Sequence, residues 1–207
     1  MTGKNRLAIM AVLLLAGCTT SPAVSLLGKF GAENSPARFH VCRDYGCAKS
    51  VTVSLNQAEW GQVRALFVPA PASAGEERER IRRAVALIEV LVGPKAGTQN
   101  DRAGAAIINF SRRGQQDCID EAYNSSTYLS FLARDGLLRW HDVGAPARRG
   151  FFFDRWPHNT ATITERASGK RYVVDSWFHA NGVLPEVVPL DVWLDGWHPP
   201  KKAEPTG

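Results

Sequence analysis

Two neighbouring segments in the second half of the chain alternate as β-strands do. Threonines at 160, 162 and 164 alternate with Ala161 and Ile163, and the segment 171–177 alternates in the same way. Residues 167–170 between them are Ala, Ser, Gly and Lys, which form turns readily. The pattern predicts an antiparallel hairpin, and we therefore expect the domain to contain an antiparallel sheet.

A helix is expected before this hairpin. Gly114 interrupts the preceding segment, Asp117 is a favourable N-cap, and a stripe with helical spacing then continues toward Gly136. Cys118 becomes the first helical residue. A helix and a hairpin together predict an α+β fold. The stripe consists of Ala122, Tyr123, Ser126, Leu129 and Leu132.

Two further helices are expected in the first half of the chain. The segment 55–67 has helical spacing, and prolines follow it at 69 and 71. Ser73 and Glu76 have the spacing of a capping box, and one apolar face continues from there to Val92. Gly93 and Pro94 are expected to end this second helix.

The first residues of the chain predict export. Lys4 and Arg6 precede an apolar run of about ten residues, which is too short to span a membrane. We expect a signal peptide over 1–17. Leu15-Ala16-Gly17-Cys18 resembles the lipobox of bacterial lipoproteins, which implies cleavage before Cys18 and acylation of that cysteine with fatty acids such as palmitate. An ordinary signal peptide or a soluble N-terminal helix is the alternative.

The domain boundaries follow from this export signal. Thr19, where an aspartate would retain a lipoprotein at the inner membrane, implies an outer-membrane anchor that faces the periplasm. Ser, Pro and Gly scattered over 18–37 predict a tether, 38–198 would form one domain, and 199–207 would be a disordered tail. Loss of the signal removes two of the 25 basic residues and leaves a net charge of +3 against 20 acidic ones. These basic residues are dispersed, and nothing in the pattern favours nucleic-acid binding.

The cysteines leave one thiol without an assigned partner. Cys42 and Cys47 are close in sequence, and in an oxidising periplasm we expect them to form a disulfide. The alternative is a metal site with His40, but two thiols and one imidazole fall short of the four ligands of structural zinc. No metal or cofactor is therefore expected. Cys118 remains, either as a buried apolar residue or as a nucleophile.

His158 and Asp175 follow Cys118 in an order that suits thiol chemistry. A thiol attacks as its thiolate, so it needs a base, and a carboxylate orients that base. A two-residue turn would place Asp175 opposite Thr162, about 13 Å along the strand from His158. A four-residue loop over 166–169 would place Asp175 opposite Thr160, diagonal to His158 and within reach. A triad therefore requires the longer loop, and His179 is the alternative base.

These residues resemble the transglutaminase-like family of papain-type thiol enzymes, which includes bacterial cysteine peptidases. In that family the nucleophilic cysteine opens a helix packed on an antiparallel sheet, and the histidine and aspartate lie on successive strands. Cys118, His158 within Trp156-Pro157-His158-Asn159, and Asp175 match these positions over roughly 114–177. The chain departs from the family pattern in Gln115-Gln116-Asp117 before the cysteine and in Pro157, where a glycine is common.

The resemblance implies a lipid-anchored thiol enzyme that acts on peptide or protein amide bonds through an acyl-enzyme. Hydrolysis and transfer to an amine share these early steps and both remain open. Gln115 or Gln116 could contribute a side-chain amide to an oxyanion hole, and Trp156 and Trp177 could wall a substrate groove. The alternative is a non-catalytic envelope lipoprotein that uses the same groove to bind a partner or peptide.

Overall fold

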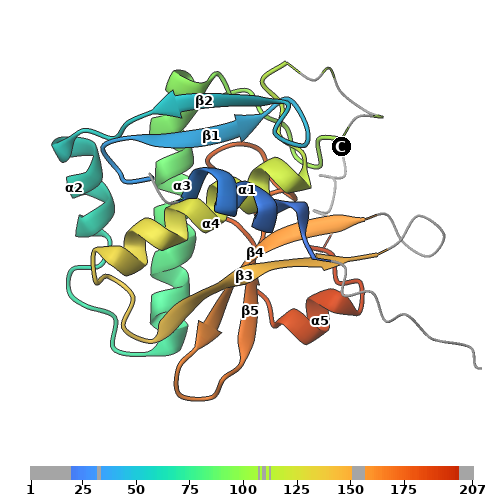
Figure 1. Ribbon diagram of the computed structural model, residues 1–207. Helices are drawn as coiled ribbons and strands as arrows, with labels where there is room; N and C mark the ends of the chain where they lie inside the picture. The colour runs from blue at the N-terminus through green and yellow to red at the C-terminus, as the bar shows by residue number, and fades with distance from the viewer. Residues whose placement is uncertain are drawn as a thin grey trace, which may run out of the picture.

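The computed structural model describes residues 20–31, 34–106, 108, 111, 113–150 and 157–200. Within them the chain has an α+β fold with two antiparallel sheets, one of strand order β1-β2 and one of order β3-β4-β5 (Figure 1). The helices are α1 (Pro22–Phe30), α2 (Gln57–Ala65), α3 (Ala74–Ala96), α4 (Cys118–Arg134) and α5 (Leu190–Leu194), and the strands are β1 (Phe39–Arg43), β2 (Lys49–Val53), β3 (His141–Arg149), β4 (His158–Glu165) and β5 (Arg171–Val174).

Helix α4 is the centre of the fold. It packs against β3 and β4 of the larger sheet and also contacts β1, α1 and α3 (Figure 1). All five residues of the predicted stripe are buried, and Leu129 and Leu132 join the main apolar core with Ile81, Phe39 and Ile163. Burial of such a side chain contributes about 2 kcal/mol each. This packing holds the first turn of α4 in a defined position over the sheet.

The first turn of α4 has the cap that the sequence predicts. The backbone of Asp117 is extended, and its carboxylate accepts the amides of Ile119 and Asp120. The carboxylate of Asp120 in turn accepts the amide of Asp117 at 3.2 Å. These reciprocal bonds form a capping box, so the helix begins at Cys118.

The predicted hairpin is confirmed, with the longer of the two loops. Strands β4 and β5 are antiparallel with Thr162 opposite Val173. The amide of Glu165 donates to the carbonyl of Lys170 at 2.9 Å, which closes a four-residue loop over 166–169. Strand β3 pairs with the other edge of β4, so β4 is the middle strand of the sheet.

Helix α3 does not end at Gly93 and Pro94 as predicted. Pro94 lies inside the helix, which continues to Ala96 and ends at Gly97 in the left-handed conformation (φ 77°). The amide of Gly97 donates to the carbonyl of Gly93 at 2.8 Å. A left-handed glycine with this bond is a common helix end, and it replaces the proline as the stop signal.

The segment expected to be a tether contains helix α1. Ser21 caps this helix, Pro22 occupies its first position, and Ala23 is fully buried against α4. A small apolar cluster holds it there, because Leu26, Leu27 and Phe30 pack beside Ala122 and Tyr123. The described part of 18–37 is therefore ordered structure, and the cause is an apolar face that scattered Ser and Gly residues obscured.

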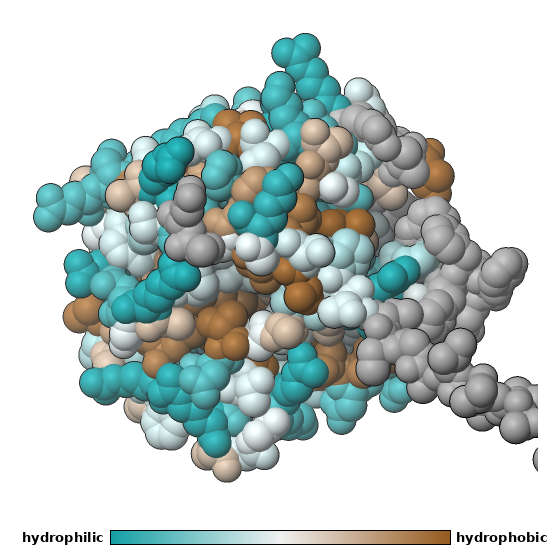
Figure 2. All heavy atoms as spheres, viewed as in Figure 1, coloured by the Kyte–Doolittle hydropathy of each residue, from teal (hydrophilic) through white to brown (hydrophobic). Residues whose placement is uncertain are grey.

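Other expectations about the chain ends fall largely outside the described residues. The expected signal peptide over 1–17 and the expected acylation site Cys18 lie outside them, as does most of the expected tail over 199–207. No described helix combines the length and apolar character needed to cross a membrane. On the face that carries α1 and β3, apolar residues are visible between hydrophilic side chains (Figure 2).

Candidate active site

Cys118 occupies the first position of α4 and is partly exposed. It is the free cysteine of the described chain, because Cys42 and Cys47 form a disulfide. Its sulfur accepts a hydrogen bond from Nδ2 of Asn159 at 3.4 Å, and it lies 3.9 Å from the carbonyl oxygen of Pro157. The thiol is thus placed against the start of β4, where His158 lies.

His158 and Asp175 form a buried hydrogen-bonded pair. Nε2 of His158 lies 2.7 Å from Oδ2 of Asp175, and both side chains are almost completely buried. Asp175 follows directly after β5 and is fixed by two backbone hydrogen bonds with Glu186, each 2.9 Å. The register of β4 with β5, continued by one residue, places Asp175 opposite Thr160, which is the arrangement that the longer loop predicts.

Aromatic rings enclose the imidazole. The ring of His158 lies 4.6 Å from that of Trp177, 5.2 Å from that of Phe178 and 5.3 Å from that of Trp193. Trp193 also donates its Nε1 hydrogen to Oδ2 of Asp175 at 2.8 Å. Arg149 lies 4.3 Å over the ring of Trp193 and hydrogen-bonds to the backbone of α5. This enclosure keeps water away from the His158 and Asp175 pair.

The proton of His158 is strongly held. Burial lowers the pKa of His158, but the Asp175 charge and hydrogen bond, together with Cys118, outweigh burial and raise that pKa to about 9. Nδ1 has no hydrogen-bond partner among the described residues, so it is the nitrogen available to the thiol. At neutral pH the site therefore favours an imidazolium beside the sulfur, which is the partner that a thiolate requires.

Carboxyl groups near the start of α4 are less charged than their number suggests. The sequence indicates that Asp117, Asp120 and Glu121 would oppose a thiolate. Burial, followed by the charge of Asp117, raises the pKa of Asp120 well above its usual range. Burial, followed by neighbouring carboxylates of which Glu89 is the first, does the same for Glu121. Groups that hold their protons carry no charge, so opposition to a thiolate is reduced.

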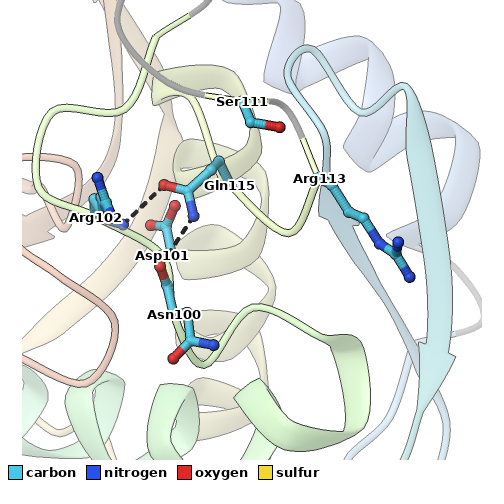
Figure 3. A pocket seen from close by; sticks show the side chains of 6 residues that line it. All are labelled: Asn100, Asp101, Arg102, Ser111, Arg113 and Gln115. Atoms are coloured by element: carbon cyan, nitrogen blue, oxygen red, sulfur yellow. Dashed lines mark hydrogen bonds between the residues drawn. The ribbon is translucent and has the colours of Figure 1, made fainter.

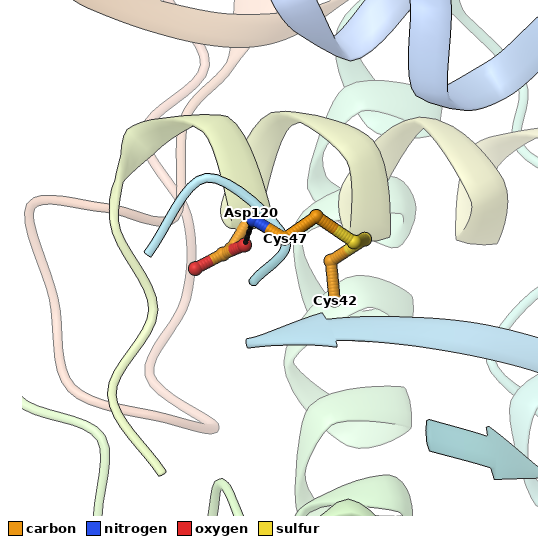
Figure 4. Close-up of side chains that lie close together, drawn as sticks. All are labelled: Cys42, Cys47 and Asp120. Carbon is orange, nitrogen blue, oxygen red and sulfur yellow. Dashed lines mark hydrogen bonds between the residues drawn. A yellow bond between two sulfur atoms is a disulfide. The ribbon is translucent and has the colours of Figure 1, made fainter. Parts of the chain in front are cut away.

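The disulfide loop holds the acidic residues on both sides of Cys118. Amides of Tyr45 and Cys47 donate to Asp120 at 2.9 and 2.6 Å, and the amide of Gly46 donates to Asp117 at 3.0 Å. Asp120 lies directly against this loop (Figure 4). All of residues 44–47 have positive φ between 58° and 68°, which turns successive amides toward one side.

The alternative of a metal site at these cysteines does not fit the structure. The ligand atoms of Cys42, Cys47 and Asp120 lie within 4.8 Å of one another. The two sulfurs are bonded to each other, however, and a metal binds thiolates. The ring of His40 lies 3.2 Å from Ser50 instead. Cys42 and Cys47 therefore form a cross-link rather than a metal site.

The two glutamines before Cys118 use their side chains elsewhere. Gln115 donates to the carbonyl of Asn100 at 2.9 Å and accepts the amide of Arg102 at 3.1 Å. Gln116 donates to the carbonyl of Cys42 at 3.3 Å. Neither amide is directed at the sulfur of Cys118, so both glutamines fix the loops around α4. The side-chain amide that does contact the sulfur belongs to Asn159, which the sequence analysis did not select.

A pocket lies beside the start of α4 (Figure 3). The loop that forms one wall is tied to the site, because Trp177 donates to the carbonyl of Ala105 at 2.8 Å and accepts the amide of Gly104 at 2.7 Å. Trp177 therefore contacts both this loop and His158, whereas Trp156 lies outside the described residues. The lining residues are Asn100, Asp101, Arg102, Ser111, Arg113 and Gln115.

Trp193 is a site residue that the sequence analysis did not select. It lies 18 residues after Asp175 and donates to the carboxylate of that residue. No spacing rule connects it to the triad, because its contact with Asp175 arises from the packing of α5 beside β5.

Comparison with known proteins adds no relative, since no protein-family model, curated protein or solved structure matches this chain.

Proposed function

We propose that the protein is a thiol enzyme that acts on peptide or protein amide bonds through an acyl-enzyme, on a transglutaminase-like core. The observation that carries the proposal is the buried 2.7 Å bond between His158 and Asp175 beside a partly exposed thiol at a helix start. Such a bond fixes the imidazole and favours its protonated form, which stabilises a thiolate. A cysteine that served only as a disulfide partner or as a core residue would not need a hydrogen-bonded histidine and aspartate beside it.

The proposed mechanism has two stages. The Cys118 thiolate attacks the substrate carbonyl, the carbon–nitrogen bond breaks, and the His158 imidazolium donates its proton to the leaving amine. A thioester remains on Cys118. Water or an acceptor amine then attacks this thioester, neutral His158 takes the proton from the attacking group, and the cysteine leaves as a thiolate. Asp175 keeps the imidazole oriented through both stages.

The backbone amide of Cys118 is the proposed oxyanion donor. Amides of Ile119 and Asp120 are occupied by the carboxylate of Asp117, and the amide of Glu121 bonds to the carbonyl of Asp117. Among the described residues, the Cys118 amide has no such acceptor, and it belongs to the reacting residue itself. A helix N-terminus also carries partial positive charge, which favours an oxyanion there.

The proposed location is the bacterial envelope. The lipobox-like residues 15–18 and Thr19 support a lipid anchor in the outer membrane facing the periplasm. The Cys42 and Cys47 disulfide is consistent with an oxidising compartment. The anchor can be tested separately from the chemistry. Cells are fed a labelled fatty acid, and mass mapping of the N-terminal peptide then shows whether Cys18 carries it.

The test of the proposed chemistry is labelling of Cys118 by a thiol-directed electrophile, followed by peptide mass mapping. Cys118→Ala should abolish labelling. His158→Ala should slow it by roughly a hundredfold near neutral pH, because the imidazolium is lost. Asp175→Asn should slow it by roughly tenfold, because only the orientation and charge of His158 change.

The matched control is His179→Ala. His179 is the alternative base, but its Nε2 lies 2.9 Å from Glu186 and it serves that pair instead. This variant should label at a rate within about twofold of the unmodified protein. If His158→Ala stays folded and labels as fast as the unmodified protein, the enzymatic proposal fails and a peptide-binding groove becomes the better account.

A further inference from the structure

The sulfur of Cys118 has a second polar neighbour besides the triad. Nδ2 of Asn159 lies 3.4 Å from it, within the range of a hydrogen bond to sulfur. Asn159 is only 3 % exposed, so its amide group has little access to water. A buried amide that has lost water needs protein partners for its donors and acceptor. Its contacts therefore define what it can do.

Ser21 determines which end of this amide faces the sulfur. Its hydroxyl oxygen accepts the amide of Ala23 at 3.3 Å as the cap of α1, and it lies 2.9 Å from Oδ1 of Asn159. Because the hydroxyl oxygen is already an acceptor, its hydrogen is free to be donated to Oδ1. The NH₂ end of the Asn159 side chain must then point to Cys118, as a donor.

We propose that Asn159 is a further catalytic residue, which donates a hydrogen bond to the Cys118 thiolate, and that Ser21 is its positioning residue. This inference rests on the proposed function, because it concerns the same nucleophile. A donor stabilises negative sulfur more than a neutral thiol. An amide cannot lose its proton, so Asn159 provides this stabilisation at every pH at which His158 changes charge.

The titratable groups around the sulfur do not change in the variants that test this role. They include His158 from β4 with Asp175 behind it, Asp117, Asp120 and Glu121 from the start of α4, and the charged Arg148 and Arg149 of β3, which lie opposite Asn159 and His158 in the sheet. A change in the pH dependence of Cys118 reactivity would therefore report the loss of the amide donor. Simple loosening of the fold would instead change the rate at all pH values.

The experiment measures the rate of Cys118 alkylation by iodoacetamide from pH 4 to 10 in the exported full-length protein. This probe forms no oxyanion, so it isolates the state of the sulfur. Asn159→Leu keeps the size of the side chain and removes the donor. Its pH–rate midpoint should rise by about one pH unit, which lowers the rate about tenfold below the midpoint, while the high-pH plateau is retained.

Ser21→Ala provides a second, milder variant that retains Asn159. It should move the midpoint in the same direction by less than Asn159→Leu. The matched control is Ser73→Ala, which removes the same kind of cap from α3, where Ser73 accepts the amide of Glu76 at 3.1 Å. That control should leave the midpoint unchanged.

An unchanged midpoint in Asn159→Leu, or in a folded Ser21→Ala if the first variant does not fold, would overturn the inference. The proposed function would survive that result as long as His158→Ala still slowed labelling. Loss of the His158 dependence would instead remove the proposed function, whatever the Asn159 variant did.

Discussion

At the scale of single residues, one carboxylate oxygen organises the candidate site. Oδ2 of Asp175 accepts hydrogen bonds from both His158 and Trp193, at 2.7 and 2.8 Å. The pKa of His158 is raised from 6.5 to about 9, although burial alone would lower it. Because the folded value lies above the unfolded one, this group stabilises the fold fully below about pH 6.5 and loses that effect as pH rises through about 9.

Trp193→Phe tests the second donor to Asp175. The change keeps most of the ring that packs on His158 and removes the N–H group. Loss of a hydrogen bond to a charged group should lower the free energy of unfolding by about 1.5–3 kcal/mol, and Cys118 labelling should slow severalfold because Asp175 is less well held.

The control for this prediction is Trp60→Phe. Trp60 makes the same kind of bond, from Nε1 to Oδ2 of Asp135 at 3.0 Å, far from the site in sequence and on α2. It should lose some stability, measured by urea unfolding, without any change in labelling. Equal labelling rates in both variants would assign Trp193 to the core alone.

At the scale of elements, the site depends on how the disulfide loop meets the first turn of α4. The loop amides bind the carboxylates of Asp117 and Asp120, which lie on either side of the nucleophile in the sequence. Asp44 is also tied to this turn, since its carboxylate accepts the amide of Gly114 at 2.8 Å. Asp44, Tyr45 and Cys47 have positive φ, a conformation that residues other than glycine rarely adopt. The disulfide between Cys42 and Cys47 closes the loop and holds them in it.

Replacement of Cys42 and Cys47 by alanine should therefore affect both stability and the site. A loop this short should contribute less than the roughly 3 kcal/mol of a 15-residue loop. Asp120 would lose the loop amides that lower its pKa, so that pKa should rise further and negative charge beside Cys118 should decrease. The pH–rate midpoint for alkylation should therefore fall. Urea unfolding and labelling from pH 4 to 10 measure the two effects.

The outcome that contradicts this prediction is a variant that is destabilised but keeps the midpoint of the unmodified protein. The loop would then support the fold without acting on the nucleophile. Asn56→Ala is a suitable control, because it removes the cap of α2 and leaves the loop intact. It should lower stability by about 1 kcal/mol and leave the midpoint unchanged.

At the scale of the whole molecule, local patterns predicted the elements whose signals lie within a few residues. The N-cap at Asp117 determined where α4 begins, and the spacing of His158 and Asp175 required the four-residue loop that the structure contains. Strand β3 was not predicted, because Gly144 and Pro146 break its alternation and its pairing with β4 is irregular there. Strand β3 forms because β4 supplies its hydrogen-bond partners, and the local sequence of β3 does not show that such a partner exists.

The same limit applies to the site. Cys118, His158 and Asp175 were selected from residue type and order, and the structure brings them to one place. Asn159 and Trp193 were not selected, because their roles come from contacts with Ser21 and Asp175 across 138 and 18 residues. Helix α1, which lies within the expected tether, was not predicted for a related reason, since it is held by the surface of α4.

Three buried carboxyl side chains from distant parts of the sequence influence one another electrostatically. Glu89 lies in α3, Asp101 in the loop after it, and Glu121 in α4. Burial, with the other carboxylates nearby, raises the pKa of Glu89 and that of Asp101 to about 7. One oxygen of Glu89 accepts the amide of Gly182 at 2.9 Å, and the other has no partner in the described chain. These carboxyls are best accommodated when they are protonated.

Glu89→Gln should therefore stabilise the protein relative to the unmodified chain as pH rises. The folded state binds the Glu89 proton more tightly than the unfolded state, whose pKa is near 4.5, so the unmodified protein loses stability as pH increases from 4.5 through about 7. A glutamine has no proton to lose, so the difference in unfolding free energy should be small at pH 5 and should grow in favour of the variant toward pH 8. Glu79→Gln on the exposed side of the same helix, where Glu79 pairs with Arg82, should show no such growth. Urea unfolding at several pH values measures both, and a Glu89→Gln difference that is constant with pH would mean that Glu89 is charged in the folded protein.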